Sequence, residues 1–273
     1  MRLHRPLQAA TLLAAALLTS AAPAQDEVPF ITTPDHVTLA MLQLAHVGPR
    51  DHIIDLGSGD GRIVITAARR FGASGLGVEI VPDLVQRSRS TAAKAGVAAR
   101  AEFLEQDLFK TDLSSATVVT MYLLPEVNLQ LRPALLALKP GTRIVSHDWD
   151  LGDWAPDETR TLDVPDKPVG REKLSRLHLW VVPASVQGLW CGPRGGSLQL
   201  QQTYQRVQGS LSAAGTAVSL SGTLSGQDLR VLASEGRALT LQHTPAGLQV
   251  TAAGAWTAWR GAAFSRAAGA RCG

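Results

Sequence analysis

A glycine-rich segment carries the strongest chemical signal in the chain. Residues 55–61 read Asp-Leu-Gly-Ser-Gly-Asp-Gly, between a short apolar run and an amphipathic stretch. The glycines of this loop are Gly57, Gly59 and Gly61. Glycine is required where a backbone turns sharply and approaches a ligand more closely than a Cβ allows. A dinucleotide-binding loop would place its third glycine at residue 62, which here is Arg62. The carboxylate of Asp55 suits a cationic or amino-bearing ligand better than a pyrophosphate.

Two more acidic residues follow the next apolar runs. Glu79 comes 22 residues after Gly57, where a carboxylate can accept both hydroxyls of an unphosphorylated ribose. Asp107 follows a third apolar run and can accept a hydrogen bond from an adenine amino group. Because the carboxyl ends of parallel strands meet at one edge of an open α/β sheet, we expect these acids and glycines to converge on one ligand.

The elements that must position these residues alternate between apolar strands and amphipathic helices, which is typical of a parallel sheet with crossover helices. The expected strands are 52–56, 76–79, 101–104, 117–124 and 143–146. The expected helices are 62–71, stopped by Gly72, then 82–95 and 126–138. Two further strands, 159–164 and 178–182, have no convincing helix between them and predict an antiparallel hairpin at the sheet edge. The sequence therefore predicts an α/β, Rossmann-like sheet of seven strands with helices on both faces.

The glycine loop, Glu79 and Asp107 together resemble the first three motifs of the class I, seven-strand S-adenosylmethionine-dependent methyltransferases. The match covers roughly residues 29–184. More narrowly, the segment Pro-Phe-Ile-Thr-Thr-Pro at 29–34 resembles the protein-lysine methyltransferases of the mitochondrial inner membrane and their bacterial relatives. The resemblance implies a methyltransferase domain at residues 25–184 and S-adenosyl-L-methionine as the cofactor.

The same resemblance implies roles for single residues. The implied cofactor-binding residues are Thr33, Asp55, Gly57, Gly59, Gly61, Glu79 and Asp107. Gly57 and Gly59 would face the methionine moiety of the cofactor. Glu79 would bind the ribose and Asp107 the adenine, while the segment around Thr33 would cover the cofactor.

The acceptor side of the site is expected where the fourth and fifth strands end. Methyl transfer from a sulfonium is an in-line displacement, so positioning supplies most of the catalysis, but an amine acceptor must still lose a proton. Tyr122 and Glu126 are the candidate catalytic residues, and their alternative roles are a packed aromatic ring and an acid favoured at a helix start. His147 and Asp148 are the candidate acceptor pocket, with a solvated acidic loop as the alternative. Two such ligands without a third at suitable spacing do not predict a metal site.

The N-terminus has the layout of a secretory signal peptide. Residues 1–24 contain Arg2 and Arg5, an apolar stretch, and small residues at the cleavage positions. We therefore expect export, with a periplasmic location. The alternatives are a membrane anchor formed by an uncleaved N-terminal segment, or an ordinary buried helix.

Residues 185–273 differ in composition and predict a separate, small all-β domain. Short alternating apolar stretches are separated by glycines at hairpin-like intervals, which favours a small antiparallel sheet or barrel. The two cysteines of the chain, Cys191 and Cys272, can form a disulfide in an oxidising compartment or remain two unrelated thiols. Seven arginines against two acidic residues suit either an anionic envelope or membrane surface or a solvated face.

The sequence as a whole favours an enzyme that methylates an amine, such as a lysine of a protein substrate. The basic residues are spread, without a run of five like charges, so nucleic acid is not expected as a partner despite the net charge of +3. The alternative is an exported binding or scaffold protein that retains the methyltransferase fold without turnover. A nicotinamide oxidoreductase is disfavoured by Arg62. The sequence makes no prediction of the oligomeric state.

Overall fold

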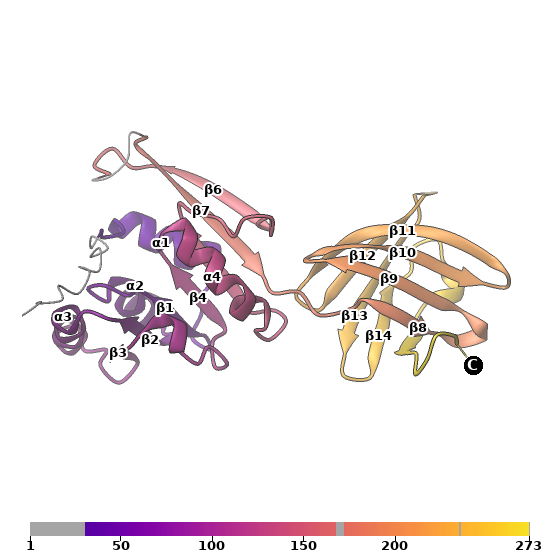
Figure 1. The fold of residues 1–273 in the computed structure, drawn as a ribbon, viewed down its shortest axis with the longest axis horizontal. Coiled ribbons are helices and arrows are strands. Elements are labelled where there is room, and N and C mark those ends of the chain that lie inside the picture. Colours follow the sequence, from indigo (N-terminus) through magenta and orange to yellow (C-terminus); the bar gives the residue numbers. More distant parts are fainter. Residues whose placement is uncertain (1–30, 168–171, 235, 273) are drawn as a thin grey trace, which may run out of the picture. The chain divides into compact units, whose positions relative to one another are not determined.

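The computed structural model describes residues 31–167, 172–234 and 236–272. The segment predicted to be a signal peptide lies outside these residues. The sheet strands are β1 (His52–Leu56), β2 (Ser74–Glu79), β3 (Ala101–Glu105), β4 (Val118–Met121), β5 (Arg143–His147), β6 (Glu158–Asp163) and β7 (Leu174–Val181). The helices are α1 (Asp35–Leu44), α2 (Arg62–Thr66), a π-helical turn (Ala67–Phe71), α3 (Pro82–Lys94), a 3-10 turn (Leu108–Lys110) and α4 (Pro125–Leu136). Figure 1 shows their arrangement.

These strands form one seven-stranded sheet in the order β3-β2-β1-β4-β5-β7-β6. The first five pair in parallel, and β7 is antiparallel to both β5 and β6. Strand order reverses at β1, where β2 lies on one side and β4 on the other. A doubly wound sheet binds its ligands at the carboxyl ends of the strands beside this reversal. The predicted Rossmann-like fold with an antiparallel edge pair is confirmed.

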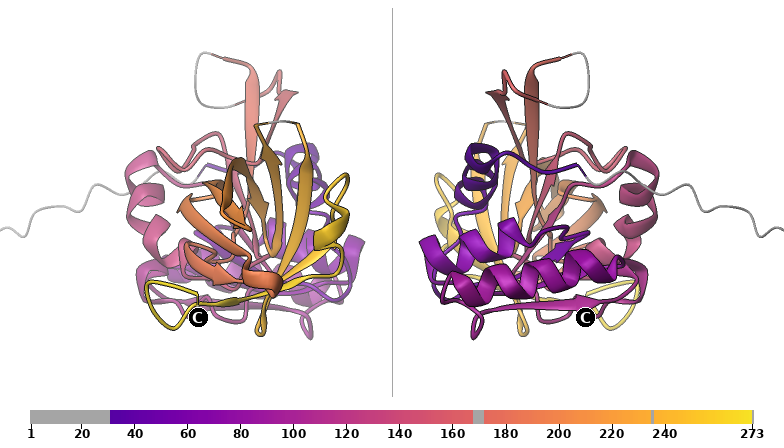
Figure 2. Two further views of the ribbon diagram at one scale, coloured as in Figure 1. Left: turned by 90° about the vertical axis from the view of Figure 1, so that its right-hand side faces the viewer. Right: turned by 90° about the vertical axis from the view of Figure 1, so that its left-hand side faces the viewer.

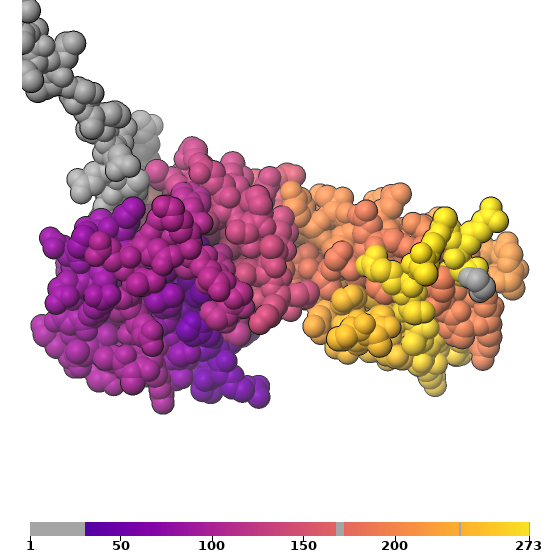
Figure 3. All heavy atoms as spheres, turned by 60° about the horizontal axis from the view of Figure 1, so that its bottom comes forward, coloured from indigo at the N-terminus to yellow at the C-terminus, as the bar shows by residue number. Residues whose placement is uncertain are grey.

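Helices cover both faces of the sheet, because successive strand residues point to opposite sides. Ile53 packs in one core with residues of α1 such as Met41. Its neighbour Ile54 packs in a second core with Leu131 and Leu135 of α4. In the right-hand view of Figure 2, the indigo α1 and the magenta α4 lie on opposite sides of the sheet. Side chains fill the spaces between the ribbons, as the spheres of Figure 3 show.

Some predicted boundaries were wrong. The fourth strand was expected to run from 117 to 124 but ends at Met121. Pro125 opens α4 and Leu124 before it is extended and 44% exposed, so the last three apolar residues form a loop. The helix that begins at Arg62 ends in a π-helical turn rather than a regular one, and Gly72 stops it in the left-handed region as predicted.

The C-terminal strands close into an eight-stranded barrel. They are β8 (Gly188–Cys191), β9 (Ser197–Thr203), β10 (Arg206–Ala213), β11 (Thr216–Ser225), β12 (Asp228–Ala233), β13 (Ala238–Thr244), β14 (Gly247–Ala252) and β15 (Ala263–Arg266), with 3-10 turns at Pro193–Gly195 and Thr257–Trp259. Trp190 and Trp256 are buried in its core and Trp259 packs against it. This confirms the predicted all-β domain.

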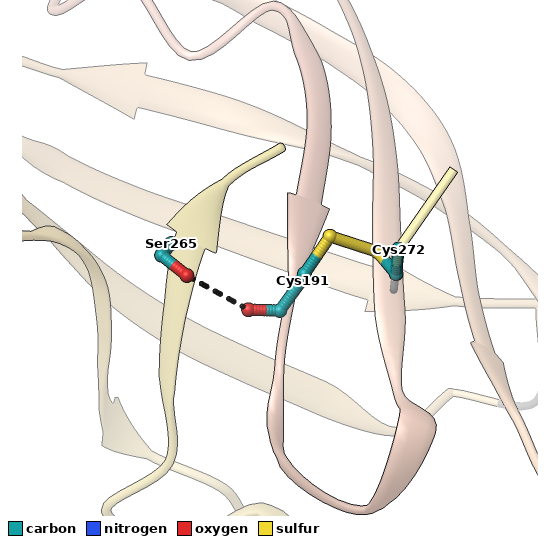
Figure 4. Close-up of a disulfide and its surroundings, with 3 residues drawn as sticks. All are labelled: Cys191, Ser265 and Cys272. Carbon is teal, nitrogen blue, oxygen red and sulfur yellow. Dashed lines mark hydrogen bonds between the residues drawn. A yellow bond between two sulfur atoms is a disulfide. The ribbon is translucent and has the colours of Figure 1, made fainter. Parts of the chain in front are cut away.

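A disulfide joins Cys191 in β8 to Cys272 near the end of the chain. Figure 4 shows this bond beside β15, where the hydroxyl of Ser265 donates to the carbonyl of Cys191. The bond links the opening strand of the barrel to the segment that follows its last strand. Among the described residues, no helix is long and apolar enough to cross a membrane.

Candidate functional site

The glycine loop leaves β1 through three left-handed backbone positions. Gly57, Gly59 and Gly61 have φ of 73°, 53° and 78°, which favour glycine. A Cβ on Gly57 would lie 2.8 Å from Cδ2 of Leu123, and a Cβ on Gly61 would lie 2.6 Å from the ring of Phe103. The first glycine therefore lets the segment after β4 approach the loop. The third permits close packing of α2 against β3.

Glu79 ends β2 and faces the loop. Its Oε2 accepts a hydrogen bond from the backbone amide of Gly59 at 2.9 Å. Its Oε1 accepts from the amides of Ile80 and Val81 at 2.8 and 3.1 Å. A carboxylate held by backbone donors has a fixed position, and hydrogen bonds to an ionised group are strong. Glu79 and the glycine loop thus lie together, as the sequence predicts.

Asp107 lies close to Glu79 at the same edge of the sheet. The amide of Gln106 donates to the carbonyl of Glu79 at 3.0 Å, so the end of β3 lies beside the end of β2. Asp107 accepts from the amide of Phe109 at 3.0 Å, and its Oδ2 lies 3.6 Å from Nζ of Lys110. Its side chain is about one-third exposed. An acid in this position is accessible to a ligand at the strand ends.

Asp55 is buried inside the sheet, with 2% of its surface exposed. Its Oδ1 accepts a hydrogen bond from the hydroxyl of Thr120 in β4 at 2.7 Å. Burial raises the pKa of Asp55 to about 7, and the charges of Glu79 and Asp60 add to the rise, while the Thr120 bond opposes it. The sequence predicted a carboxylate beside the loop that suits a cationic ligand. The structure instead buries this carboxyl in the core, bonded to Thr120, and burial favours its protonated form.

Arg62 connects the glycine loop to the N-terminal segment. Its Nε and Nη2 bond the two oxygens of Asp60 at 2.9 and 2.7 Å, a bidentate pair. Its Nη1 donates to the backbone carbonyl of Thr33 at 2.7 Å. Thr33 is buried, so the segment expected to cover the cofactor is held against the loop. Sequence analysis used Arg62 only to exclude a dinucleotide loop and missed this role.

A second cluster lies where β4 and β5 end. Nδ1 of His147 lies 3.2 Å from the hydroxyl of Thr33, and its Nε2 lies 2.8 Å from the hydroxyl of Ser175. The ring of Tyr122 packs on the imidazole with centroids 4.0 Å apart. Burial lowers the pKa of His147 to about 4, and the nearby Lys167 charge adds to the fall while Asp148 opposes it. His147 is therefore neutral at physiological pH.

Asp148 follows His147 with a left-handed backbone, φ 65°. Its Oδ2 lies 2.7 Å from Nζ of Lys167 and accepts from the hydroxyl of Tyr122 at 3.4 Å. Its Oδ1 accepts from the amide of Arg176 at 3.0 Å. Burial raises the pKa of Tyr122 to about 12, and the Asp148 charge adds to the rise. The phenol is therefore protonated at neutral pH and acts as a hydrogen-bond donor rather than a base.

The four predicted acceptor-side residues do not all meet. Tyr122, His147 and Asp148 form one cluster, whereas Glu126 is exposed in the first turn of α4. Within the described part of the chain, no hydrogen bond or ion pair of the Glu126 side chain is found. Asn128, which sequence analysis missed, is buried and donates to the backbone carbonyls of residues 149 and 150, so α4 holds the loop that follows β5.

Lys167 and Ser175 were not predicted as site residues, because both belong to the β6–β7 hairpin and stand in no motif. The predicted antiparallel hairpin at the sheet edge was the signal that could have directed attention to this segment. Across residues 31–167, 172–234 and 236–272, no group of three or more His, Cys, Asp or Glu side chains could hold a metal ion.

The chain is similar to known methyltransferases. The family model of the ANTKMT methyltransferase domain matches residues 55–158. A protein-lysine N-methyltransferase from Saccharolobus islandicus is 45% identical over 133 residues, which are 48% of this chain and 83% of that relative. Adenine nucleotide translocase lysine N-methyltransferase from Mus musculus is 34% identical over 135 residues, which are 49% of this chain and 58% of that relative.

A solved structure described as an RNA methyltransferase from Salinibacter ruber, in complex with S-adenosyl-L-homocysteine, is also similar. It shares 51% identity with this chain and has a TM-score of 0.52. The match covers 57% of this chain and 96% of that structure.

Proposed function

Because this chain belongs to the class I S-adenosylmethionine-dependent methyltransferases, in the family of the Saccharolobus protein-lysine N-methyltransferase, we propose that it methylates the side-chain amine of a protein lysine. The observation that carries the proposal is the position of the Tyr122–His147–Asp148 cluster beside the glycine loop. The backbone carbonyl of Thr33 accepts a hydrogen bond from Arg62 at the glycine loop, and the hydroxyl of Thr33 bonds His147 of the cluster. The acceptor pocket and the cofactor site thus share one covering segment.

The residues at the sheet edge fit S-adenosyl-L-methionine. The left-handed glycines leave a surface without side chains at Gly57 and Gly59, and the amide donors that fix Glu79 leave lone pairs of its carboxylate for a ribose. Asp107 is open to an adenine amino group at the neighbouring strand end. When bound there, the cofactor supplies an electrophilic methyl group on a sulfonium. Thr33 would close over it.

The protein contributes orientation and charge rather than a strong base. Tyr122 is a neutral phenol and His147 a neutral imidazole, so neither ring adds a charge beside Asp148. The carboxylate of Asp148 attracts the cationic form of the acceptor and orients its nitrogen. Glu126 stands exposed after the Tyr122 loop, where it can meet an approaching cationic segment, and remains a prediction for acceptor binding.

RNA is the second candidate acceptor, because the Salinibacter structure is described as an RNA methyltransferase and is 51% identical. One experiment separates the two. The full chain is incubated with radiolabelled S-adenosyl-L-methionine and either a protein extract or total RNA, with Glu79→Gln as the control of weakened cofactor binding. Complete hydrolysis followed by chromatography should yield N-methylated lysine from protein. Label found only in nucleosides would contradict the lysine proposal and favour RNA.

We also infer that the protein is exported and acts in the cell envelope. The support is the layout of residues 1–24 together with the disulfide between Cys191 and Cys272, since disulfides persist in oxidising compartments. Fractionation of cells into cytoplasm, periplasm and membrane, followed by thiol titration of the recovered protein, tests this. Two free thiols in a cytoplasmic fraction would contradict it.

A further inference from the structure

Lys167 forms an unusually enclosed ion pair in the connection between β6 and β7. Its Nζ lies 2.7 Å from Oδ2 of Asp148, and the two side chains are only 11% and 15% exposed. Nζ also donates to the backbone carbonyl of Leu174. Most ion pairs between lysine and aspartate stand in water and contribute little. This one lies largely out of water, so each charge depends on the other.

The surroundings of Asp148 are those of a small cation site. One oxygen is occupied by the amide of Arg176, which fixes the carboxylate in place. The other faces both the Tyr122 hydroxyl and the ammonium of Lys167. The tilted rings of Tyr122 and His147 lie beside this oxygen, with centroids 4.0 Å apart, and Nε2 of His147 is 3.6 Å from it. A primary alkylammonium is the group that fits a fixed carboxylate beside aromatic carbon.

This cation site adjoins the glycine loop. Leu123 follows Tyr122 directly, and its Cδ2 lies 2.8 Å from the position that a Cβ on Gly57 would take. His147 precedes Asp148 directly and meets the covering residue Thr33 at 3.2 Å. Leu123 and Tyr122 therefore connect Gly57 of the loop to the Asp148 carboxylate, and His147 connects Thr33 to it.

We propose that the Asp148 carboxylate is the binding subsite for the ammonium of the acceptor lysine, and that Lys167 fills this subsite when no acceptor is bound. The proposal rests on the proposed function, since it identifies the place of the acceptor. Lys167 is then an internal stand-in for the substrate, and an incoming lysine must displace it from Asp148. Removal of Lys167 leaves a fixed, buried carboxylate that attracts an external ammonium more strongly.

Binding of n-butylammonium chloride, a probe of the lysine side-chain end, tests the subsite without any turnover. Titration calorimetry on the full chain compares the wild type, Lys167→Gln and Lys167→Gln/Asp148→Asn. Lys173→Gln is the matched control, because Lys173 lies in the same connection and donates to the carbonyl of Lys167 without reaching Asp148. We expect Lys167→Gln to bind the probe at least tenfold more tightly than the wild type and Lys173→Gln, and the double variant to lose this gain. Equal affinities of Lys167→Gln and the wild type would overturn the proposal.

A measurement on the wild type covers the case in which Lys167→Gln does not fold. In protein labelled with ¹³C at the lysine side chains, the Lys167 resonance should move toward that of an exposed lysine as n-butylammonium is added. A Lys167 resonance that stays unchanged at saturating probe would also overturn the proposal. The Lys173 resonance serves as the internal reference.

Steady-state methylation of a lysine peptide separates failure of the subsite from failure of the function. We expect Lys167→Gln to lower KM several-fold while kcat changes little. Methylation with an unchanged KM in Lys167→Gln would contradict the subsite and leave lysine methylation standing. Tighter n-butylammonium binding in a protein that methylates no lysine would contradict the function and leave the subsite standing.

Discussion

The backbone carbonyl of Thr33 accepts a hydrogen bond from Nη1 of Arg62 across 2.7 Å, although 29 residues separate the two in the chain. This bond fastens the covering segment to the start of α2, directly after the glycine loop. The same guanidinium is held by both oxygens of Asp60, so it has one orientation. We therefore expect Arg62 to act on the proposed cofactor site as a positioning residue.

We expect Arg62→Gln to weaken S-adenosyl-L-methionine binding by about tenfold, corresponding to roughly 1.4 kcal/mol, because a charged hydrogen bond to the covering segment is lost. Calorimetric titration of the cofactor measures this. Arg70→Gln is the matched control, since Arg70 is exposed at the end of the π-helical turn. Equal losses in both variants would indicate a general effect of charge rather than the Thr33 bond.

Glu79→Gln should weaken cofactor binding by about 1–3 kcal/mol through loss of charge-assisted ribose bonds. Glutamine retains an oxygen that can accept from the amide of Gly59, so the loop should keep its conformation. Glu105→Gln is the control, because Glu105 pairs with Glu79 in the β2–β3 register and is exposed. Cofactor affinity that stays at the wild-type value in Glu79→Gln would remove Glu79 from the site.

Asp55 should make the stability of the fold fall as pH rises. Its pKa is raised to about 7 in the folded state, so the folded protein holds this proton more tightly than the unfolded chain. The contribution of Asp55 to the free energy of unfolding is fully present below about pH 4 and is lost as pH rises to about 7. Above that pH it no longer changes.

Asp55→Asn should abolish this pH dependence. The free energy of unfolding of the variant, relative to that of the wild type, should therefore increase by up to about 4 kcal/mol from pH 4 to pH 8. Asparagine can still accept the bond from Thr120. Urea unfolding at a series of pH values gives the measurement, and Asp112→Asn on an exposed turn is the control. A difference between wild type and Asp55→Asn that stays constant across pH would show that Asp55 titrates normally.

Loss of the disulfide should destabilise the barrel by about 4 kcal/mol, because the bond closes a long loop in the unfolded chain. The two cysteines are 81 residues apart. We expect Cys191→Ser/Cys272→Ser to lower the denaturant midpoint of the barrel transition and to leave S-adenosyl-L-methionine affinity unchanged. Reductant should reproduce the effect in the wild type and have none on the double variant.

The sequence indicated the parts of the site that local backbone chemistry dictates. Left-handed turns require Gly57 and Gly59, and an acid at the end of β2 is visible as Glu79, so the loop and its partner could be located from spacing alone. Burial cannot be read from spacing, so the enclosed position of Asp55 was not foreseen. Nor was the ion pair of Lys167, which depends on a hairpin returning across the sheet.

Fold class was predictable because the alternation of strand and helix patterns repeats along residues 52–147. The wrongly predicted end of the fourth strand shows the limit of that pattern. The run from Val118 to Leu124 is apolar apart from the hydroxyls of Thr120 and Tyr122, yet its last part leaves the sheet to reach Pro125. In this last part, Leu123 is apolar because it packs against the glycine loop and not because it pairs in the sheet. A pattern of residue types does not distinguish these two reasons.

The two sheets of this protein differ in their exposure to strand addition by a second chain. The barrel is closed, so each of its strands has a partner on both sides, whereas the seven-stranded sheet ends in β3 and β6. An unpaired strand edge is a template for aggregation, and charged side chains protect it. β3 carries Glu102 and Glu105, and β6 carries Glu158 and Arg160, all on short strands. A strand of a second chain could therefore be added to the folded protein only at β3 or β6, where charged side chains disfavour such pairing.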